Sequence, residues 1–432
     1  MLVNQPVDPY TLTAVDATNS TRITLSLCPT GLTMHKLLIE ADGFDTRDVL
    51  CAPELSDSFK EEGRKFMNQI VGRYTNRLPA GKVHIYDSSK SDRNPLTQLN
   101  LDENESFPGF PERGNCLHSG ANGYDLRDFV YMSPQSNIVK EFEELCQDGI
   151  SNSNPDQQCH HFYLHSPDGD QGFPEPVDIL ATVTLQMLTT TKDRSLDVDD
   201  RFDCSRGVAQ AGFSLRAKLS PKKDVHSSRM TPINLTWHTG YILNNFQQVK
   251  PLDGIAHHKL WIDTDRFLAI DNFGLPTGEI QSTKLIGADF LDRDPHLGDS
   301  SNSIKDIMPL TGFDHCMLFK ESSKDVDPKV VLKSPNNDVA LVFRSNQPAV
   351  QCYTPNCFDG NGTRKKIHHN VSNESVGGYN KQDAIYLEFQ QSTSLCTNLK
   401  LQQALKGGHN ASNKFCTPCT FAHVMHKELR FY

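Results

Sequence analysis

Short runs of alternating apolar and polar residues recur along the chain, separated by Gly, Pro, Asn and Asp. These runs are rich in β-branched and aromatic residues, which favour strands. Side chains alternate between the two faces of a strand, so each run can bury one face and leave the other polar. The pattern predicts strands in TRITLSLC (21–28), KVHIYD (82–87), VDILATVTLQML (177–188), HKLWIDTDRFLAI (258–270), KVVLKS (329–334), DVALVFRS (338–345), AVQCYT (349–354) and DAIYLEFQQ (383–391).

Helical periodicity is scarce by comparison. The best candidates are FKEEGRKFMNQIVGRY (59–74) and VKEFEELCQD (139–148). Many short strands, few short helices and no internal repeat indicate an all-β fold, a large antiparallel sandwich or barrel. No composition break marks a linker, so we predict one domain over residues 1–432. Polar insertions are expected near 137–160, 189–229 and 360–382.

Some of the predicted strands carry a polar residue among apolar ones. In PINLTWHTGYIL (232–243), Trp237 belongs to an apolar face, and His238 belongs to the opposite, polar face. In DAIYLEFQQ, Glu388 alternates with apolar residues in the same way. A carboxylate in an otherwise apolar strand needs water or a partner. These two residues are therefore candidates for a groove that the sheet presents.

Two further segments repeat this arrangement. TGFDHCMLF (311–319) carries Asp314 and His315, and VGRYTNRLPAGK (71–82) carries Arg73, Thr75 and Arg77 on one predicted face. Polar faces of antiparallel sheets are commonly just solvated, so the pattern alone establishes only a sheet with a polar face. That set of side chains also suits carbohydrate chemistry, because a Glu/His pair can move protons between two oxygens of one sugar ring.

Charge and hydropathy narrow the classes of partner. The formal net charge of −10 disfavours a nucleic-acid partner, which requires clustered Lys and Arg. No apolar run approaches the roughly 20 residues that span a bilayer, and MLVNQPVDPY at the start lacks the features of a signal peptide. We therefore expect neither a nucleic-acid partner nor a membrane span.

The cysteine content bears on the compartment. Twelve cysteines and seven N-x-S/T sequons favour a secreted, disulfide-bonded glycoprotein whose signal peptide is absent from this chain; a cytoplasmic protein is the alternative. In CTPC (416–419) a structural disulfide is favoured over an inert thiol pair. A redox or metal role ranks last, because no second CxxC completes a zinc site.

Eight segments in order resemble the aldose 1-epimerase (galactose mutarotase) family. VGRYTNRLPAGK is similar to the family's glycine–arginine–x–x–asparagine–arginine segment, and GNCLHSGANGYDLRDF to its leucine–histidine–glycine–glycine segment. SPDGDQGFPEPV and TPINLTWHTGYIL resemble its serine–proline–aspartate–glycine turn and its asparagine–histidine–serine–tyrosine strand. FLAIDNFGLPTGEI, TGFDHCMLF, QPAVQCYTPNCFDG and AIYLEFQ follow in the family's order. The resemblance implies the galactose mutarotase-like supersandwich, from about residue 40 to the end.

The resemblance also implies roles for matching residues. Glu388 resembles the general base that takes the proton of the C1 hydroxyl, and His238 resembles the general acid that protonates the ring oxygen. Ring opening, rotation and re-closure then interconvert the α and β anomers of a free hexose such as galactose or glucose. Neither a cofactor nor a metal is required. The implied sugar-binding residues are Asn76, Arg77, His118, Asp314 and Gln351.

The implied chemistry requires a charged Glu388 and a largely protonated His238 near neutral pH. We expect their mutual attraction to favour both charged forms, and the coupled pair to give a bell-shaped pH profile. The chain departs from the family pattern at Trp237, at Ser119 and in the QSTSL that follows AIYLEFQ. We expect these changes at the rim of the site, where they would affect sugar preference.

Two other functions stay open. A non-catalytic secreted sugar-binding or structural glycoprotein could use the same scaffold, as the cysteines and sequons suggest. A hexose-6-phosphate mutarotase would need a basic phosphate pocket, for which Arg73 and Lys82 are the nearest candidates. Asn234 is a sequon residue on the predicted face of His238, so we expect it to carry no glycan.

Overall fold

A computed structural model describes residues 9–55, 58–60, 64–85, 95, 97–107, 109–110, 113–146, 157–188, 209–220, 229–247, 254–288, 304, 312–323, 325, 327–369, 377–392, 404–407 and 422–423. Strands dominate this part of the chain, and the α-helix α1 (Asn137–Cys146) overlaps the second segment predicted as helical, residues 139–148. The other predicted helix, residues 59–74, starts in the short 3-10 helix η1 (Ser58–Lys60) but is wrong over Arg64 to Tyr74, which contains no helix and includes strand β5 (Ile70–Val71).

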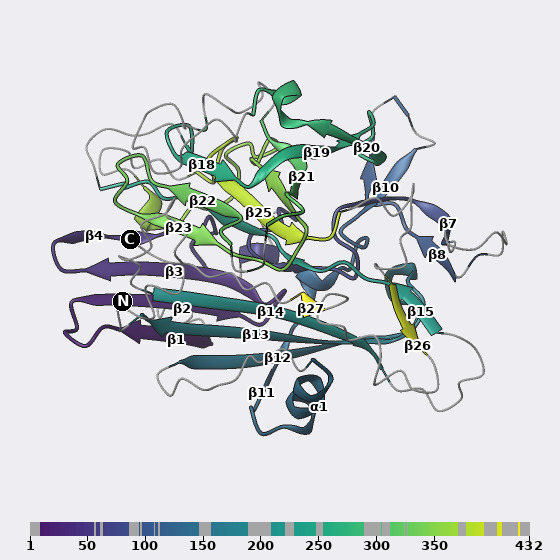
Figure 1. Cartoon of the computed structure of the whole chain (residues 1–432), viewed down its shortest axis with the longest axis horizontal. Helices are drawn as coiled ribbons and strands as arrows, with labels where there is room; N and C mark the ends of the chain where they lie inside the picture. Colours follow the sequence, from purple (N-terminus) through teal and green to yellow (C-terminus); the bar gives the residue numbers. More distant parts are fainter. Residues whose placement is uncertain are drawn as a thin grey trace.

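The first half of the chain, together with the short strand β27 near its other end, supplies one layer of antiparallel strands. One sheet has the order β1-β2-β3-β4, and another the order β11-β12-β13-β14-β27. The strands are β1 (Tyr10–Val15), β2 (Thr21–Cys28), β3 (Thr33–Ala41), β4 (Phe44–Asp48), β11 (Val130–Met132), β12 (Gln158–Ser166), β13 (Val177–Met187), β14 (Ala209–Leu219) and β27 (Ala422–His423). Figure 1 shows β1–β3 and β12–β14 running side by side in this layer.

The second half supplies the facing layer, around a sheet of order β17-β25-β24-β21-β19-β20. These strands are β17 (Thr239–Tyr241), β19 (Thr264–Ile270), β20 (Pro276–Ser282), β21 (Asp314–Phe319), β24 (Ala349–Tyr353) and β25 (Ile385–Gln390). A smaller sheet, β18-β22-β23, comprises β18 (Lys259–Ile262), β22 (Val330–Lys333) and β23 (Ala340–Phe343). Two layers of antiparallel strands confirm the predicted all-β sandwich.

Short strand pairs complete the fold at one end of the layers. β6 (Arg77–Pro79), β10 (Gly114–Leu117) and β9 (Glu105–Ser106) form a three-stranded sheet. The pairs are β7 (Gly81–Ile85) with β8 (Thr97–Leu101), β5 with β16 (Thr236–Trp237), and β15 (Arg229–Pro232) with β26 (Ala404–Gly407). The short β6-β10-β9 sheet places the start of the Arg77 strand next to the loop that carries His118.

The main core lies between the two layers. Ile179, Ala181 and Val183 from β13 and Ile385 and Leu387 from β25 belong to one buried apolar cluster. Alternation explains this arrangement, because every second residue of each strand points into the gap between the sheets. The opposite face of β25 is then free to carry the polar residues of a site.

Parts of the stretches expected to be insertions belong to the sheets or the interior. The stretch 189–229 contains β14, which pairs with β13 along its whole length. In the stretch 360–382, Lys365, His368 and Tyr379 are almost completely buried. The single-domain boundary stays a prediction. No helix in the described segments is both long and apolar enough to cross a membrane.

Candidate active site

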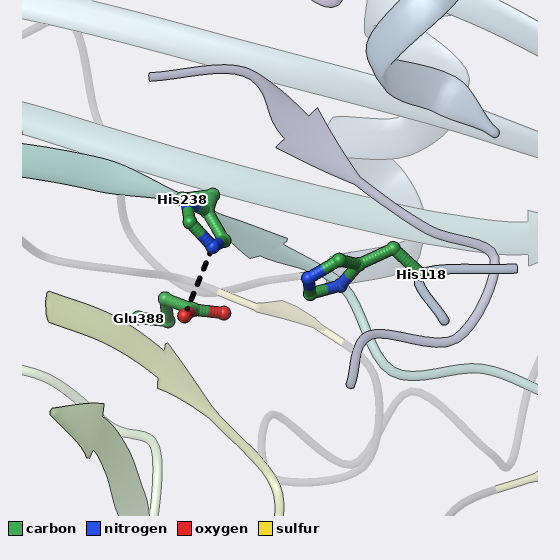
Figure 2. Close-up of side chains that lie close together, drawn as sticks. All are labelled: His118, His238 and Glu388. Atoms are coloured by element: carbon green, nitrogen blue, oxygen red, sulfur yellow. Dashed lines mark ion pairs between the residues drawn. The ribbon is translucent and has the colours of Figure 1, made fainter. Parts of the chain in front are cut away.

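The imidazole of His238 and the carboxylate of Glu388 meet although 150 positions separate them in the sequence. The chain around His238 changes partner: β16 pairs with β5, and β17 pairs with β25. His238 lies at this junction, opposite in direction to Trp237, which packs in the core. Its Nε2 atom is 3.2 Å from Oε1 of Glu388, and both side chains are buried (Figure 2).

Strand register brings two further predicted residues beside Glu388. Gln351 on β24 lies directly opposite Glu388 on β25. Asp314 begins the next strand, β21, and its Oδ1 accepts a hydrogen bond of 2.7 Å from the Gln351 side chain. The amide oxygen of Gln351 and Oε2 of Glu388 are buried and have no hydrogen-bond partner among the described residues. A buried polar atom without a partner is costly, so both atoms are suited to receive a ligand's hydroxyl groups.

His118 and Asn76 form the opposite wall. The Asn76 backbone N–H donates a hydrogen bond of 3.1 Å to Nδ1 of His118. Nδ1 must therefore be unprotonated, and neutral His118 carries its proton on Nε2, where it can act as a donor. Both residues have positive φ, 66° for Asn76 and 49° for His118. Such non-glycine conformations concentrate at functional sites.

Ser119 has a structural explanation. It stands where the family motif has a glycine, and its φ of 69° is a conformation that glycine adopts easily. Its hydroxyl accepts a hydrogen bond of 2.6 Å from the Tyr74 N–H and donates one of 3.0 Å to the Tyr74 carbonyl. This two-way contact ties the His118 loop to the segment that carries Asn76.

Arg77 completes the set of predicted residues in the site. Its Nη1 is 3.6 Å from Oδ2 of Asp314, and its other nitrogens pair with Glu105. All seven predicted site residues line one cleft of about 280 Å³, which is small even for a ligand site. A cleft of this size is suited to one small, polar molecule.

Sequence reasoning missed other residues that line the cleft, among them Phe66, Glu105 and Tyr353. The ring of Phe66 lies 4.5 Å from that of His118 and 5.9 Å from that of His238. Glu105 lies outside the conspicuous strand runs, and Phe66 lies in the segment 59–74 predicted as helical, so the sequence pattern marks neither residue for the site. Tyr353 alternates with Gln351 on a predicted strand, and that spacing could have identified it.

The pKa values of the central pair move opposite to our expectation. Burial lowers the pKa of His238 to about 4, although the carbonyl groups of His238 and Phe66 oppose the shift. Burial also raises the pKa of Glu388 well above its usual range; nearby Asp314 adds to the shift and Arg77 opposes it. Burial likewise holds the pKa of His118 well below its usual value. The removal of water therefore outweighs the mutual attraction of Glu388 and His238.

The two shifts together favour a pair that holds a single proton. Adding a second proton, or removing the last one, would leave a net charge in a buried site. With one proton, the pair is neutral overall whether that proton lies on Glu388 or on His238. Such a pair can release a proton at one atom and accept one at the other without changing its net charge.

A metal is a poor fit to these residues. Ligand-type atoms of His118, His238 and Glu388 lie within 4.8 Å of one another. However, the Asn76 N–H occupies Nδ1 of His118, and the proton on Nε2 blocks the remaining lone pair. The His118 tautomer suits a hydrogen bond to an oxygen better than it suits a metal ion.

Two expectations about charged and polar neighbours are wrong. Arg73 does not share a face with Arg77, because its buried guanidinium donates to carbonyl groups of the 166–175 turn, including that of Glu175 at 2.7 Å. Lys82 lies on exposed β7, and neither it nor Arg73 lines the cleft. Trp237 was expected at the rim of the site, but it lies in the core. There its indole N–H donates a hydrogen bond to the Leu32 carbonyl.

Asn234 does not line the cleft either. It is buried, and its amide pairs with both the backbone N–H and the carbonyl of Gln391, at 3.1 and 3.3 Å. The expected position on the face of the groove is therefore wrong, and the absence of a glycan stays a prediction that now rests on burial.

The described cysteines give no support to a disulfide framework. Cys51, Cys116, Cys159, Cys352 and Cys357 are free thiols, and the neighbours Cys352 and Cys357 are buried and exposed respectively. The CTPC segment lies outside the described residues. The secreted location stays a prediction.

Comparisons with known proteins point to one family. The family model described as aldose 1-epimerase matches residues 213–402. A protein named aldose 1-epimerase from Haemophilus influenzae is 30% identical over 301 residues, covering 70% of this chain and 67% of that protein. Galactose mutarotase of Homo sapiens is 26% identical, covering 68% of this chain and 64% of that protein.

Solved structures show the same fold. A GalM/aldose epimerase homologue from C. elegans superposes with a TM-score of 0.59 at 19% identity, covering 89% of this chain and 91% of that one. Galactose 1-epimerase from Lactobacillus acidophilus gives a TM-score of 0.58 at 19% identity, with 92% and 94% covered. The fold is that of the galactose mutarotase-like sandwiches. The chain belongs to the aldose 1-epimerase family.

Proposed function

We propose that this protein is a mutarotase that interconverts the α and β anomers of a free, neutral hexose such as galactose or glucose. The observation that supports this proposal most strongly is the buried contact between His238 and Glu388 inside a cleft of sugar size. General acid–base catalysis needs a donor and an acceptor within reach of two atoms of one substrate. The names of the family relatives support the same reaction class.

The reaction follows from the single proton of the pair. With a closed sugar bound, the productive form has the proton on His238 and a charged Glu388. Glu388 takes the proton of the C1 hydroxyl, His238 gives its proton to the ring oxygen, and the bond between C1 and the ring oxygen breaks. The product is the open aldehyde, with neutral His238 and protonated Glu388.

Ring closure restores the starting state. After rotation about the bond between C1 and C2, the former ring oxygen attacks the other face of C1 and returns its proton to His238. Glu388 gives its proton to the aldehyde oxygen, which becomes the new C1 hydroxyl. The pair ends with the single proton that it began with, so all protons balance and no external acid or base is consumed.

The remaining residues of the cleft hold the sugar. His118 donates from Nε2, Asp314 and the amide oxygen of Gln351 accept, and Arg77 donates from Nη1. Fixing the ring in this way keeps the C1 hydroxyl next to Glu388 and the ring oxygen next to His238. Correct placement of reacting atoms accelerates proton transfer without new chemistry.

A non-catalytic binding protein is the alternative, and the central pair speaks against it. Two ionisable groups buried at 3.2 Å cost folding free energy, and a scaffold has no use for them. A hexose-6-phosphate mutarotase is not supported, because the two residues expected to form its phosphate pocket, Arg73 and Lys82, do not line the cleft.

Optical rotation of freshly dissolved α-D-galactose and α-D-glucose tests the proposal. We expect the wild-type protein to accelerate the approach to equilibrium over buffer. The isosteric variant Glu388→Gln should lose about 10²- to 10⁴-fold in rate, the usual contribution of a positioned acid or base. Glu279→Gln, the same change at an exposed position of β20, is the matched control and should retain the wild-type rate. A wild-type rate equal to buffer for several hexoses would establish the scaffold reading.

A further inference from the structure

The basic side chains that line the cleft already interact with other groups of the protein, which reduces the positive charge available to a ligand. Arg64 pairs with Asp125 through two contacts of 2.7 and 2.6 Å. Arg77 pairs with Glu105, and Lys65 donates to the Asn361 carbonyl at 2.6 Å. The lining also includes the carboxyl groups of Asp314 and Glu388. Because the Glu388/His238 pair is neutral overall, the three cations of the lining are balanced by Glu105, Asp314 and the Asp125 partner of Arg64, which is unfavourable for an anionic ligand.

Glu105 controls the orientation of Arg77. Its carboxylate accepts from Nε at 2.8 and 3.1 Å and from Nη2 at 3.0 Å. This fork-like contact occupies one whole edge of the guanidinium, and such bidentate pairs fix geometry as well as charge. The third nitrogen, Nη1, does not contact Glu105 and faces Asp314 instead. Glu105 thus presents only one nitrogen of Arg77 to a ligand.

Neighbouring groups hold both members of this pair. The buried side chain of Asn115 donates to Oε2 of Glu105 at 3.0 Å and to the Phe273 carbonyl at 2.7 Å. Gly274, in a turn with φ of 73°, packs against the arginine, since a Cβ at this position would lie 2.9 Å from Cδ of Arg77. The backbone of this turn therefore approaches the Arg77 side chain closely. The arrangement is built from several elements and is not a chance surface contact.

Resting on the proposed function, we propose that Glu105 is a specificity residue that makes the cleft select neutral sugars against sugars bearing a carboxylate or phosphate. It does so by neutralising Arg77 and by limiting it to a single hydrogen-bonding nitrogen. Glu105 touches neither Glu388 nor His238, so it acts through Arg77. Without the Glu105 carboxylate, Arg77 would keep only the more distant Asp314 as a counter-charge, in a small, partly dry cleft where charges interact strongly.

The experiment compares sugars that differ only at C6. We would measure kcat/KM for D-galactose and D-galacturonate, and for D-glucose and D-glucose 6-phosphate, with wild type and Glu105→Gln. We expect the ratio of anionic to neutral sugar to rise about tenfold or more in Glu105→Gln, through a lower KM for the anion. For galactose we expect a higher KM with little change in kcat, because the catalytic pair is untouched.

Two variants serve as controls. Glu103→Gln removes the same charge two positions away, where the side chain is exposed and lines a different cleft, so the sugar ratio should stay at the wild-type value. Glu105→Asp keeps the carboxylate and should retain most of the preference for neutral sugars. If Glu105→Gln loses activity equally on both sugars, or if Glu103→Gln changes the ratio as much, the proposal is wrong.

Failure of this proposal can be told apart from failure of the proposed function. Wild-type turnover of galactose tests the function first, independently of any ratio. If wild type has no turnover, calorimetric titration with galactose and galacturonate still measures the same preference at equilibrium. An unchanged preference in Glu105→Gln then overturns the specificity role by itself.

Discussion

Two buried ionic clusters in this protein differ in one informative respect. In the first, Nζ of Lys365 contacts Oδ2 of Asp48 at 2.6 Å and the Leu50 carbonyl at 3.1 Å. The backbone N–H groups of Leu37 and Leu50 donate to Oδ1 of the same carboxylate. In the second, the cluster of Glu388 and Gln351, one oxygen of each side chain has no partner among the described residues. A satisfied cluster stabilises a fold, and an unsatisfied one is available to a ligand.

The two arginines of one short segment repeat this contrast. The Arg73 guanidinium is surrounded by backbone carbonyls and hydroxyl groups of a turn, so it serves the scaffold. Arg77, four positions later, reaches the cleft and keeps one nitrogen near Asp314. Residue type and spacing do not separate these two roles. The two roles differ in the number of hydrogen bonds that other residues of the protein make to each guanidinium group.

Among substitutions in the two clusters, we expect the largest effect to be a loss of folding stability. Lys365→Met leaves the Asp48 carboxylate buried without its cation, which should lower the free energy of unfolding by about 3–5 kcal/mol. Urea denaturation measures this loss. Lys366→Met, at the exposed neighbouring position, should change stability little. Glu388→Gln should be at least as stable as wild type, because burial disfavours the charged form of Glu388 and glutamine carries no charge. Equal losses in Lys365→Met and Glu388→Gln would remove the distinction between the clusters.

The second prediction concerns the pH dependence of activity, which tests the protonation of Glu388 and His238. The active pair holds one proton, and kcat/KM reports the pKa values of the free enzyme. Since burial lowers the pKa of His238 to about 4, the acid limb should lie well below the ordinary histidine value of 6.5. Since the pKa of Glu388 is raised, the last proton leaves only well above 4.5, which sets the alkaline limb. Activity should fall about tenfold per pH unit outside this broad plateau.

The measurement is polarimetry at constant ionic strength, with the buffer-catalysed rate subtracted at each pH. An acid limb with its midpoint at the unperturbed histidine value would contradict the single-proton pair. It would instead support the mutual stabilisation of two charged groups that the sequence had led us to expect.

The smallest effect concerns Ser119, which contacts Tyr74 in both directions. Ser119→Ala keeps the backbone conformation available but removes both hydrogen bonds, and should lower the free energy of unfolding by about 1–2 kcal/mol. We also expect a modest rise in KM, because His118 precedes this residue. Ser133→Ala, an exposed serine before α1, is the control in the same urea titration. No difference between the two variants would show that the hydroxyl of Ser119 does not hold the loop.

Much of this protein follows from its sequence. Alternation in DAIYLEFQQ places Leu387 toward the core and Glu388 away from it, and β25 has that arrangement because a strand has only two faces. The ordered motifs indicated the family and seven of the residues that line the cleft. The amphipathic pattern of 139–148 predicted a helix, and α1 lies there.

Only the tertiary structure decided which polar groups are satisfied. Arg73 and Arg77 look alike in the sequence, and the 166–175 turn and Glu105 separate their roles across long stretches of chain. Burial of His238 and Glu388 reversed the expected pKa shifts, because removal of water depends on every element packed around them. Strand faces are local properties that spacing encodes, whereas hydrogen-bond partners and exposure to water are decided only when distant segments meet.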